Sequence, residues 1–395
     1  MKVVQINSVC GKGSTGKICA SISNLLTEQG IENYILHTTD GNTHPLGVQY
    51  MSSFSVKIQA LKAKVFGNYG FQTRIATKRL IKKLDEISPD IVQLHNLHGH
   101  NVNFELLFKY LKKKNKKIYW TFHDCWAFTS YCMYFDMVGC DEWKTGCKNC
   151  PQRKHYSWFL DRSEHIYKKK KKLLSGLDLN IITPSRWLAD LVKKSFLGDY
   201  PIKVINNGID LSIFKPSDSD FRERYNIPKE KIILLGVANV WEARKGLDAF
   251  LYLADNLDAE KYQIVLVGTN DLVDKILPKK IISIHRTSNQ KELAEIYSAA
   301  NLFINPTRED NFPTVNLESL ACGTPIITFD TGGSSECLAE GCGCKIPCGN
   351  KQELCSLING FDDIHLSRKD CLNRAVLFDQ NEKFKEYLEL YQVYE

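Results

Sequence analysis

The most informative stretch of this 395-residue chain runs from Asp310 to Pro325: Asp-Asn-Phe-Pro-Thr-Val-Asn-Leu-Glu-Ser-Leu-Ala-Cys-Gly-Thr-Pro. Its spacing predicts a short helix over residues 315–321, with Asp310 before the helix and a second carboxylate, Glu318, within it. The first N–H groups of a helix have no partner within the helix. The stretch therefore predicts a polar site where carboxylates accept hydrogen bonds from hydroxyl groups and backbone amides face phosphate or sugar oxygens.

A second polar cluster, Arg244-Lys245-Gly246, begins a predicted helix after a buried strand. A helix N-terminus attracts anions because its unpaired N–H groups and its dipole both present positive charge. Two adjacent cations strengthen that preference. Arg244 and Lys245 therefore indicate a diphosphate-binding site.

Strand and helix patterns alternate along the whole chain, which favours an α/β fold of two doubly wound parallel-sheet domains facing across a cleft. The turn-rich segment 206–210 marks the junction between them. Ligands of such sheets bind outside the carboxyl ends of the strands. Strands are predicted at 3–8, 34–38, 90–94, 117–122, 180–183, 202–205, 231–237, 263–267, 281–285, 302–304 and 325–328. Helices are predicted at 15–29, 74–87 (with Ile75, Leu80, Ile81 and Leu84 inward), 104–113, 186–194, 246–257, 290–299, 315–321 and 368–391.

A glycine-rich loop, Gly11-Lys12-Gly13-Ser14-Thr15-Gly16-Lys17, follows the first predicted strand and begins a helix. It fits the dinucleotide pattern G-x-G-x-x-G and most of a P-loop. Ile18 stands where a P-loop needs Ser or Thr, and the acid that a dinucleotide site needs, Asp40, lies beyond the second strand. The remaining interpretation is a loop in which Gly13 and Gly16 let the backbone approach a phosphate or a sugar.

Two histidines follow predicted strands of the first half. His123 lies in Thr121-Phe122-His123-Asp124, and His95 closes Gln93-Leu94-His95. A single histidine at such a position is usually structural, but two of them at ligand-binding strand ends favour a functional role.

Four cysteines fall within one irregular loop, residues 131–153: Cys132, Cys140, Cys147 and Cys150. The N-terminal residues have the pattern of a strand and not of a secretory signal, so we expect a reducing, cytoplasmic compartment in which disulfides are disfavoured. The spacing suits a structural zinc ion, which would replace the core that a loop of little apolar content lacks. The alternative is four reduced cysteines packed as small hydrophobic residues.

The charge is divided unevenly along the chain. Residues 1–200 contain 30 Lys and Arg against 16 Asp and Glu, whereas residues 201–395 contain 22 against 29. The basic runs at residues 112–117 and 168–172 lack interleaved aromatic residues, which argues against a nucleic-acid partner. An anionic membrane surface fits them at least as well. The candidate contacts are Lys57, Lys62 and Lys64, spaced so that one helix face could present them beside Ile58, Leu61 and Val65. A solvated basic face is the alternative.

Taken as a set, these motifs resemble glycosyltransferase family 4, whose members are retaining enzymes of the GT-B fold. The segment from Asp310 to Glu318 matches the family's E-x7-E signature, with Asp in place of the first Glu, and residues 317–325 are especially similar. The glycine loop, residues 121–124, 207–210 and 245–246, and Gly332-Gly333 with Glu336 agree in order. The stretch 123–151 resembles a subgroup from bacterial capsule and colanic-acid polysaccharide clusters.

The resemblance implies an acceptor domain at 1–208, a nucleotide-sugar domain at 209–370 and a helix at 371–395 that returns to the first domain. It implies transfer of a sugar, with retention and without a catalytic metal, from a nucleotide diphosphate sugar to a glycan or lipid-linked glycan at the inner face of the membrane. The implied catalytic residues are His123, Asp310 and Lys245. The implied donor-binding residues are Gly13, Gly16, Arg244, Lys245, Asn311, Phe312, Thr314, Val315 and Glu318.

Two other functions are compatible with these residues. A non-catalytic nucleotide-sugar-binding protein of the same fold would not need His123 together with both carboxylates and Lys245. The second alternative is an enzyme of the same fold that catalyses epimerisation or phosphorolysis. Phosphorolysis would need an extra phosphate site, for which the sequence has no clear pattern. Asp218-Ser219-Asp220 matches a metal-binding D-x-D but lies in a polar stretch after the junction, so we interpret it as linker.

Overall fold

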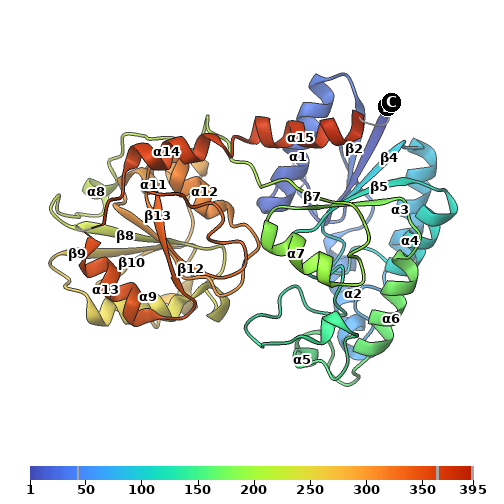
Figure 1. The fold of residues 1–395 in the computed structure, drawn as a ribbon, viewed down its shortest axis with the longest axis horizontal. Helices are drawn as coiled ribbons and strands as arrows, with labels where there is room; N and C mark the ends of the chain where they lie inside the picture. Colours follow the sequence, from blue (N-terminus) through green and yellow to red (C-terminus); the bar gives the residue numbers. More distant parts are fainter. Residues whose placement is uncertain (42–43, 362–363, 393–395) are drawn as a thin grey trace. The chain divides into compact units, whose positions relative to one another are not determined.

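The computed structural model describes residues 1–41, 44–361 and 364–392 (Figure 1). The chain forms two compact units: Met1–Asn206 with the C-terminal stretch from Lys383, and Asn207–Glu382. Each unit contains one sheet in which every recorded strand pair is parallel. The predicted α/β class with two parallel sheets is confirmed. Among the described residues, no helix is long and apolar enough to cross a membrane.

The first unit has a seven-stranded sheet in the order β3-β2-β1-β4-β5-β6-β7. The strands are β1 (Lys2–Ile6), β2 (Glu32–His37), β3 (Gly47–Gln49), β4 (Ile91–Leu94), β5 (Lys117–Thr121), β6 (Leu179–Thr183) and β7 (Ile202–Val204). The helices are α1 (Gly13–Glu28), α2 (Ser53–Phe66), α3 (Arg74–Ile87), α4 (Phe104–Lys113), α5 (Arg153–Tyr156), α6 (Ser163–Leu174) and α7 (Arg186–Lys194), with a 3-10 turn η1 (Glu142–Lys144).

The second unit has a six-stranded sheet in the order β10-β9-β8-β11-β12-β13. The strands are β8 (Ile232–Val237), β9 (Tyr262–Val267), β10 (Ile282–Ile284), β11 (Leu302–Asn305), β12 (Ile326–Asp330) and β13 (Gly343–Pro347). The helices are α8 (Phe221–Arg224), α9 (Leu247–Asn256), α10 (Asp271–Asp274), α11 (Gln290–Ala299), α12 (Thr314–Ala321), α13 (Lys351–Asn359) and α14 (Arg368–Val376), with η2 (Ala243–Lys245). The last helix, α15 (Gln380–Gln392), begins in the second unit and belongs to the first unit from Lys383 onward.

The central strands are buried on both faces, as parallel strands covered by helices must be. The covering helices are amphipathic, and α3 shows how the sequence sets their buried face. Its buried residues Ala76, Leu80 and Leu84 recur every four residues, and the helix ends at Ser88, before Pro89. Ile75 lies outside this stripe and is 73% exposed, so the prediction that it points inward is wrong.

The predicted C-terminal helix over 368–391 is in fact two helices, α14 and α15. The break lies at residues 377–379, where Ile209 N–H donates to the carbonyl of Phe378 and Gln380 N–H donates to the carbonyl of Ile209. These bonds pair the segment with a neighbouring strand-like stretch, so it cannot continue the helical ladder. Beyond the break, α15 packs on the first unit beside α1, through Phe384, Leu388 and the tyrosines 387 and 391 (Figure 1).

Candidate active site

The strand order of the second sheet reverses between β8 and β11, which is where a parallel sheet leaves a crevice at its carboxyl edge. The loop after β8 leads into η2, which carries Arg244 and Lys245. The loop after β11 runs from Pro306 to Pro313 and leads into α12. The topology therefore brings the two polar clusters found in the sequence to one place.

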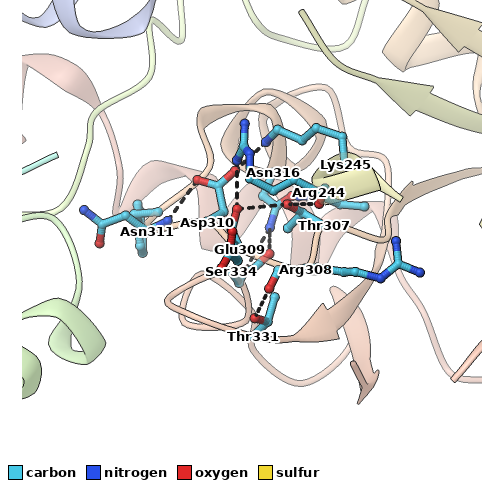
Figure 2. A network of polar contacts seen from close by, with 12 residues as sticks. Arg244, Lys245, Thr307, Arg308, Glu309, Asp310, Asn311, Asn316, Thr331 and Ser334 are labelled. Carbon is cyan, nitrogen blue, oxygen red and sulfur yellow. Dashed lines mark hydrogen bonds and ion pairs between the residues drawn. The ribbon is translucent and has the colours of Figure 1, made fainter. Parts of the chain in front are cut away.

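The two loops are held together by hydrogen bonds centred on Arg244 (Figure 2). The carbonyl of Arg244 accepts from Arg308 N–H at 2.8 Å and from Thr307 Oγ1 at 3.3 Å. Its guanidinium Nη1 donates to the carbonyl of Glu309 at 2.8 Å. Arg244 thus braces the loop after β11 as well as adding charge to the site.

Lys245 and Asp310 form an ion pair across the two loops. Lys245 Nζ lies 2.6 Å from Asp310 Oδ2, and the two side chains are 19% and 16% exposed. Asp310 Oδ1 accepts from Asn311 N–H at 2.9 Å, which holds the carboxylate in place. A cation and a carboxylate, both reachable from solvent, therefore stand side by side (Figure 2).

Two glycines allow the loops to approach this closely. Gly246 has φ +73°, and a Cβ there would lie 2.2 Å from the carbonyl oxygen of Pro306. Gly332 has φ +56°, and a Cβ there would lie 1.8 Å from the carbonyl oxygen of Asp310, which also accepts from Gly333 N–H. Only glycine fits either position, which explains the glycines noted in the sequence.

Helix α12 presents one partly exposed face to this site. Thr314, Val315 and Glu318 share that face, whereas its other residues are buried. The helix follows Pro313, has no side-chain cap and has no acid in its first turn, so its positive end is not neutralised from within the helix. Glu318 Oε2 accepts from the hydroxyl of buried Tyr297 at 3.2 Å, which fixes one side of the carboxylate.

The side chain of the predicted donor-binding residue Phe312 points into the core and not toward the site. Its side chain is buried in the core of the second unit against Phe378, and its carbonyl accepts from Asn207 Nδ2 at 2.8 Å. Any ligand contact from Phe312 is therefore limited to its backbone N–H. Asn311 is also buried, at 3% exposure.

Sequence reasoning missed the polar residues that support the site. Arg308 makes a two-pronged ion pair with Asp248, at 2.8 and 2.9 Å, and this contact lowers the pKa of Asp248. Asn316 accepts from Asn305 and donates to the carbonyl of Ser334, both in the buried layer beneath α12. The position of Asn316 inside the signature segment was the available signal, whereas Arg308 had none.

In the first unit the order reverses between β1 and β4, and the glycine loop follows β1. Helix α1 begins at Gly13, has no side-chain cap and has no acid in its first turn. Gly13 has φ +62°, and a Cβ on Gly16 would lie 3.0 Å from Val9 Cγ2. The loop is therefore tightly turned around a positive helix end, as an anion-binding loop requires.

His123 lies beside His95 at the same edge of the first sheet. His95 Nδ1 is 3.2 Å from His123 Nε2, and His123 is partly exposed while His95 is buried. Burial lowers the pKa of His123 to about 4, so the imidazole is neutral at physiological pH. The structure thus brings together Lys245 with Asp310, and His123 with His95, each pair within its own unit.

The cysteine-rich loop is built differently from the prediction. It is not poor in apolar contacts, because Trp143 stacks on Phe135 with ring centroids 5.0 Å apart and also packs against Phe128. Burial raises the pKa of Cys132, Cys147 and Cys150, and the charge of other thiols in the loop raises it further. Within the described chain, only exposed Asp271, Asp274 and His285 place three ligand atoms within 4.8 Å of one another. Zinc at the four cysteines therefore stays a prediction.

Comparison with known proteins identifies similar families for both units. A sequence profile described as Glycosyltransferase Family 4 matches residues 16–213, and a profile described as Glycosyl transferases group 1 matches residues 231–360. The first of these covers half of the chain.

Individual relatives agree with these profiles. The chain is 21% identical, over 86% of both proteins, to a protein of Escherichia coli (strain K12) assigned to colanic acid biosynthesis as the glycosyl transferase WcaC. It is 26% identical, over 51% of this chain and 57% of the relative, to the N,N'-diacetylbacillosaminyl-diphospho-undecaprenol alpha-1,3-N-acetylgalactosaminyltransferase of Campylobacter jejuni. The structure of Alr3699/HepE from Anabaena, solved with UDP and glucose, superposes with a TM-score of 0.69 at 15% identity over the full length of both chains.

Proposed function

This chain belongs to glycosyltransferase family 4, and we propose that it transfers a sugar from a nucleotide diphosphate sugar to a hydroxyl of a glycan, with retention at the anomeric carbon. The observation that carries the proposal is the Lys245–Asp310 pair at the reversal point of the second sheet, next to the uncapped end of α12. This arrangement offers a cation for a diphosphate and a carboxylate for sugar hydroxyls within one small region.

In the proposed donor site, Lys245 exchanges its contact with Asp310 for a contact with the diphosphate of the donor. In glycosyl transfer the bond between the anomeric carbon and the diphosphate oxygen breaks, and negative charge grows on the departing diphosphate. Lys245, with Arg244 behind it, would move from Asp310 to that diphosphate and stabilise the charge, the task that a bound metal performs in other enzymes. Asp310 would then be free to accept from hydroxyls of the donor sugar, and no catalytic metal is required.

Glu318 would bind the ribose of the nucleotide. It lies one helical turn beyond Thr314, on the partly exposed face of α12, and Tyr297 holds one of its oxygens. Carboxylate oxygens suit the two hydroxyls of a ribose, because they act as acceptors only. The amides of Thr314 and Val315 would contact the phosphate or the sugar.

The acceptor we propose is a growing polysaccharide, carried on a lipid. Support comes from the relatives, one assigned to colanic acid biosynthesis and one named for a diphospho-undecaprenol acceptor. A lipid-linked acceptor would require the enzyme to work at a membrane surface.

A specific surface of the first unit supports membrane contact. Helix α2, which carries the candidate lysines Lys57, Lys62 and Lys64, buries only Ala63 and contains no acidic residue. Its exposed residues include Phe54, at 72%, with Ile58, Leu61 and Phe66. The exposed residues Trp158, Phe159 and Leu160 adjoin its end, because Trp158 N–H donates to the carbonyl of Lys64. We call these side chains, with Lys57, Lys62 and Lys64, the apolar-basic surface.

Aromatic and aliphatic side chains flanked by lysines are the pattern of a surface that enters the headgroup region of an anionic bilayer. Each lysine near such a leaflet contributes about 1 kcal/mol of binding. We therefore expect binding to anionic vesicles that falls with salt and with the change of Lys57, Lys62 and Lys64 to Gln. The matched control changes Lys78, Lys193 and Lys194, exposed lysines elsewhere in the unit, to Gln. Co-sedimentation that is equal for neutral and anionic vesicles would remove the membrane role.

The zinc prediction has a direct test. Protein purified under reducing conditions is analysed for metal, and about one zinc per chain is expected if Cys132, Cys140, Cys147 and Cys150 form a structural site. Replacing Cys147 and Cys150 by Ser should release the metal. Metal-free protein of unchanged stability would favour the packed thiols.

The donor site is tested by a screen of nucleotide sugars for hydrolysis and for thermal stabilisation. One donor is expected to be cleaved slowly without an acceptor, and Lys245→Ala should lower that rate about 10- to 100-fold, since a charged hydrogen bond contributes roughly 1.5–3 kcal/mol. A nucleotide sugar that binds but is never cleaved, with or without glycan acceptors, would favour the non-catalytic binding protein.

A further inference from the structure

Three side chains from neighbouring strands form a hydrogen-bonded row in the first unit: Gln5 in β1, His95 after β4 and His123 after β5. Gln5 Oε1 lies 3.1 Å from His95 Nε2, and His95 Nδ1 lies 3.2 Å from His123 Nε2. At the inner end, Gln5 Nε2 donates to the backbone carbonyl of Cys19 at 2.9 Å. Gln5 and His95 are buried, and His123 is partly exposed at the outer end.

The inner end of the row fixes every proton in it. The carbonyl of Cys19 can only accept, so the amide of Gln5 must turn its NH₂ toward Cys19 and its oxygen toward His95. An amide oxygen also only accepts, so His95 must carry its proton on Nε2. A neutral imidazole carries one proton, which leaves His95 Nδ1 as an acceptor. His123 must therefore donate through its Nε2–H, and its own Nδ1 keeps a lone pair.

We infer that Gln5 and His95 are positioning residues that hold His123 in the Nε2–H form, so that His123 presents Nδ1 as a hydrogen-bond acceptor to a ligand hydroxyl. The importance of this for catalysis rests on the proposed function, whereas the proton positions do not. An acceptor nitrogen selects for a hydroxyl or amide donor and against a bare oxyanion. His123 would thus contact a sugar hydroxyl and not a phosphate oxygen.

The surroundings keep both rings neutral. Burial lowers the pKa of His95 well below its ordinary value, and the neighbouring His123 lowers it further. Around His123, Asp124 favours the charged form and His98 disfavours it, but burial is the largest effect. The carboxylate of Asp124 contacts a different histidine, because Asp124 Oδ2 lies 2.7 Å from His98 Nε2. Trp120 Nε1 donates to the backbone carbonyl of His95, which fixes the position of the His95 ring.

Gln93, the other amide nearby, does not hydrogen-bond to either histidine of the row. Its Nε2 donates to Thr121 Oγ1 and to a backbone carbonyl, and its oxygen accepts from Tyr391. The row therefore has one hydrogen-bonding pattern.

The proton positions can be read by nitrogen NMR of the full chain labelled at histidine, with resonances assigned from His95→Phe and His123→Gln. At pH 7 both rings are expected as neutral Nε2–H forms, each with an unprotonated Nδ1. His95→Phe and Gln5→Leu should each give a mixture of tautomers at His123, whereas His165→Gln, at an exposed position, should not. A wild-type His123 that is Nδ1–H or doubly protonated at pH 7 overturns the inference.

Kinetics separate the positioning role from simple support of the fold. His95→Phe should lower kcat/KM about tenfold, the value of one neutral hydrogen bond, while its affinity for nucleoside diphosphate stays unchanged. Unaltered kcat/KM together with a mixed tautomer would overturn the positioning role. Absence of sugar transfer in the wild type would contradict the proposed function but would leave the NMR result standing.

Discussion

Lys245 and Asp310 show how single residues set the chemistry of the second unit. Each is supplied by a loop whose course depends on a glycine, and the 2.6 Å contact forms only if both loops keep their course. The sequence allowed both residues and the glycines near them to be predicted as a site. It did not indicate that the two would pair, because that follows from strand order and not from local pattern.

Gly332→Ala tests the close approach at residue scale. The alanine would adopt an unfavourable positive φ, at a cost of about 1 kcal/mol, and its Cβ would displace the backbone of Asp310. We expect a loss of about tenfold in nucleoside diphosphate affinity, measured by calorimetry.

The matched control is Gly349→Ala, which has φ +81° but no atom within 4 Å of its Cβ. It should lose stability without losing ligand affinity. Equal affinities for the two variants would show that the approach of Gly332 to Asp310 does not shape the site.

At the scale of elements, helix α6 anchors the segment that precedes the cysteine-rich loop through one buried lysine. Lys170 Nζ donates to the carbonyls of Trp126 and Thr129, at 2.7 and 3.0 Å, and lies 3.4 Å from the centre of the Trp126 ring. Burial lowers the pKa of Lys170 well below its ordinary value. The basic run 168–172, interpreted from sequence as a solvated or membrane-facing face, therefore contains one lysine of a different kind.

Lys170→Met should destabilise the first unit because it leaves two buried carbonyls without a donor, at about 1–3 kcal/mol each. Urea unfolding followed by tryptophan fluorescence measures the free energy of unfolding. Lys171→Met, on the exposed side of the same helix, is the control and should change it by less than about 0.5 kcal/mol. An unchanged free energy for Lys170→Met would contradict the anchoring role.

The elements themselves were largely predictable where periodicity is strong. The predicted bounds of α3, α4, α7 and α11 agree with the structure, because each has a clear apolar stripe and an end signal. The edge strands β3 and β13 were missed; both begin with glycine, and β13 also ends at Pro347, so neither has the apolar pattern of a strand. The C-terminal helix was predicted as one because its break depends on pairing with Ile209, a contact far away in sequence.

At the scale of the whole molecule, the two units should respond differently to acid. His95, His100 and His123, all in the first unit, have lowered pKa values, with His100 and His123 at about 4 because of burial. The unfolded chain binds these protons near pH 6.5, so the first unit loses stability as pH falls from about 6.5 to 4. His100 and His123 together lower the free energy of unfolding by about 3 kcal/mol for each pH unit in this range. In the second unit, a hydrogen bond to Asp274 raises the pKa of His285. Protonation of His285 therefore stabilises the second unit as the pH falls, the opposite of the effect in the first unit.

The first unit should therefore unfold at a higher pH than the second. Five of the six tryptophans, all except Trp241, lie in the first unit, so the fluorescence of the wild type reports mainly on it. A variant that keeps only Trp241 reports on the second unit. If both units unfold at the same pH, or if the second unit unfolds at a higher pH than the first, the assignment of neutral buried histidines is contradicted.

The central claim is that Lys245 contacts a diphosphate and Glu318 a ribose in the second unit, and one calorimetric series tests it. Nucleoside diphosphate and monophosphate are titrated into wild type, Lys245→Ala, Glu318→Ala and the control Lys345→Ala, an exposed lysine of the same unit. We predict that Lys245→Ala removes most of the preference for diphosphate, that Glu318→Ala weakens both ligands alike, and that the control changes neither. Equal affinities for diphosphate in wild type and Lys245→Ala, with Glu318→Ala also unchanged, would contradict the account.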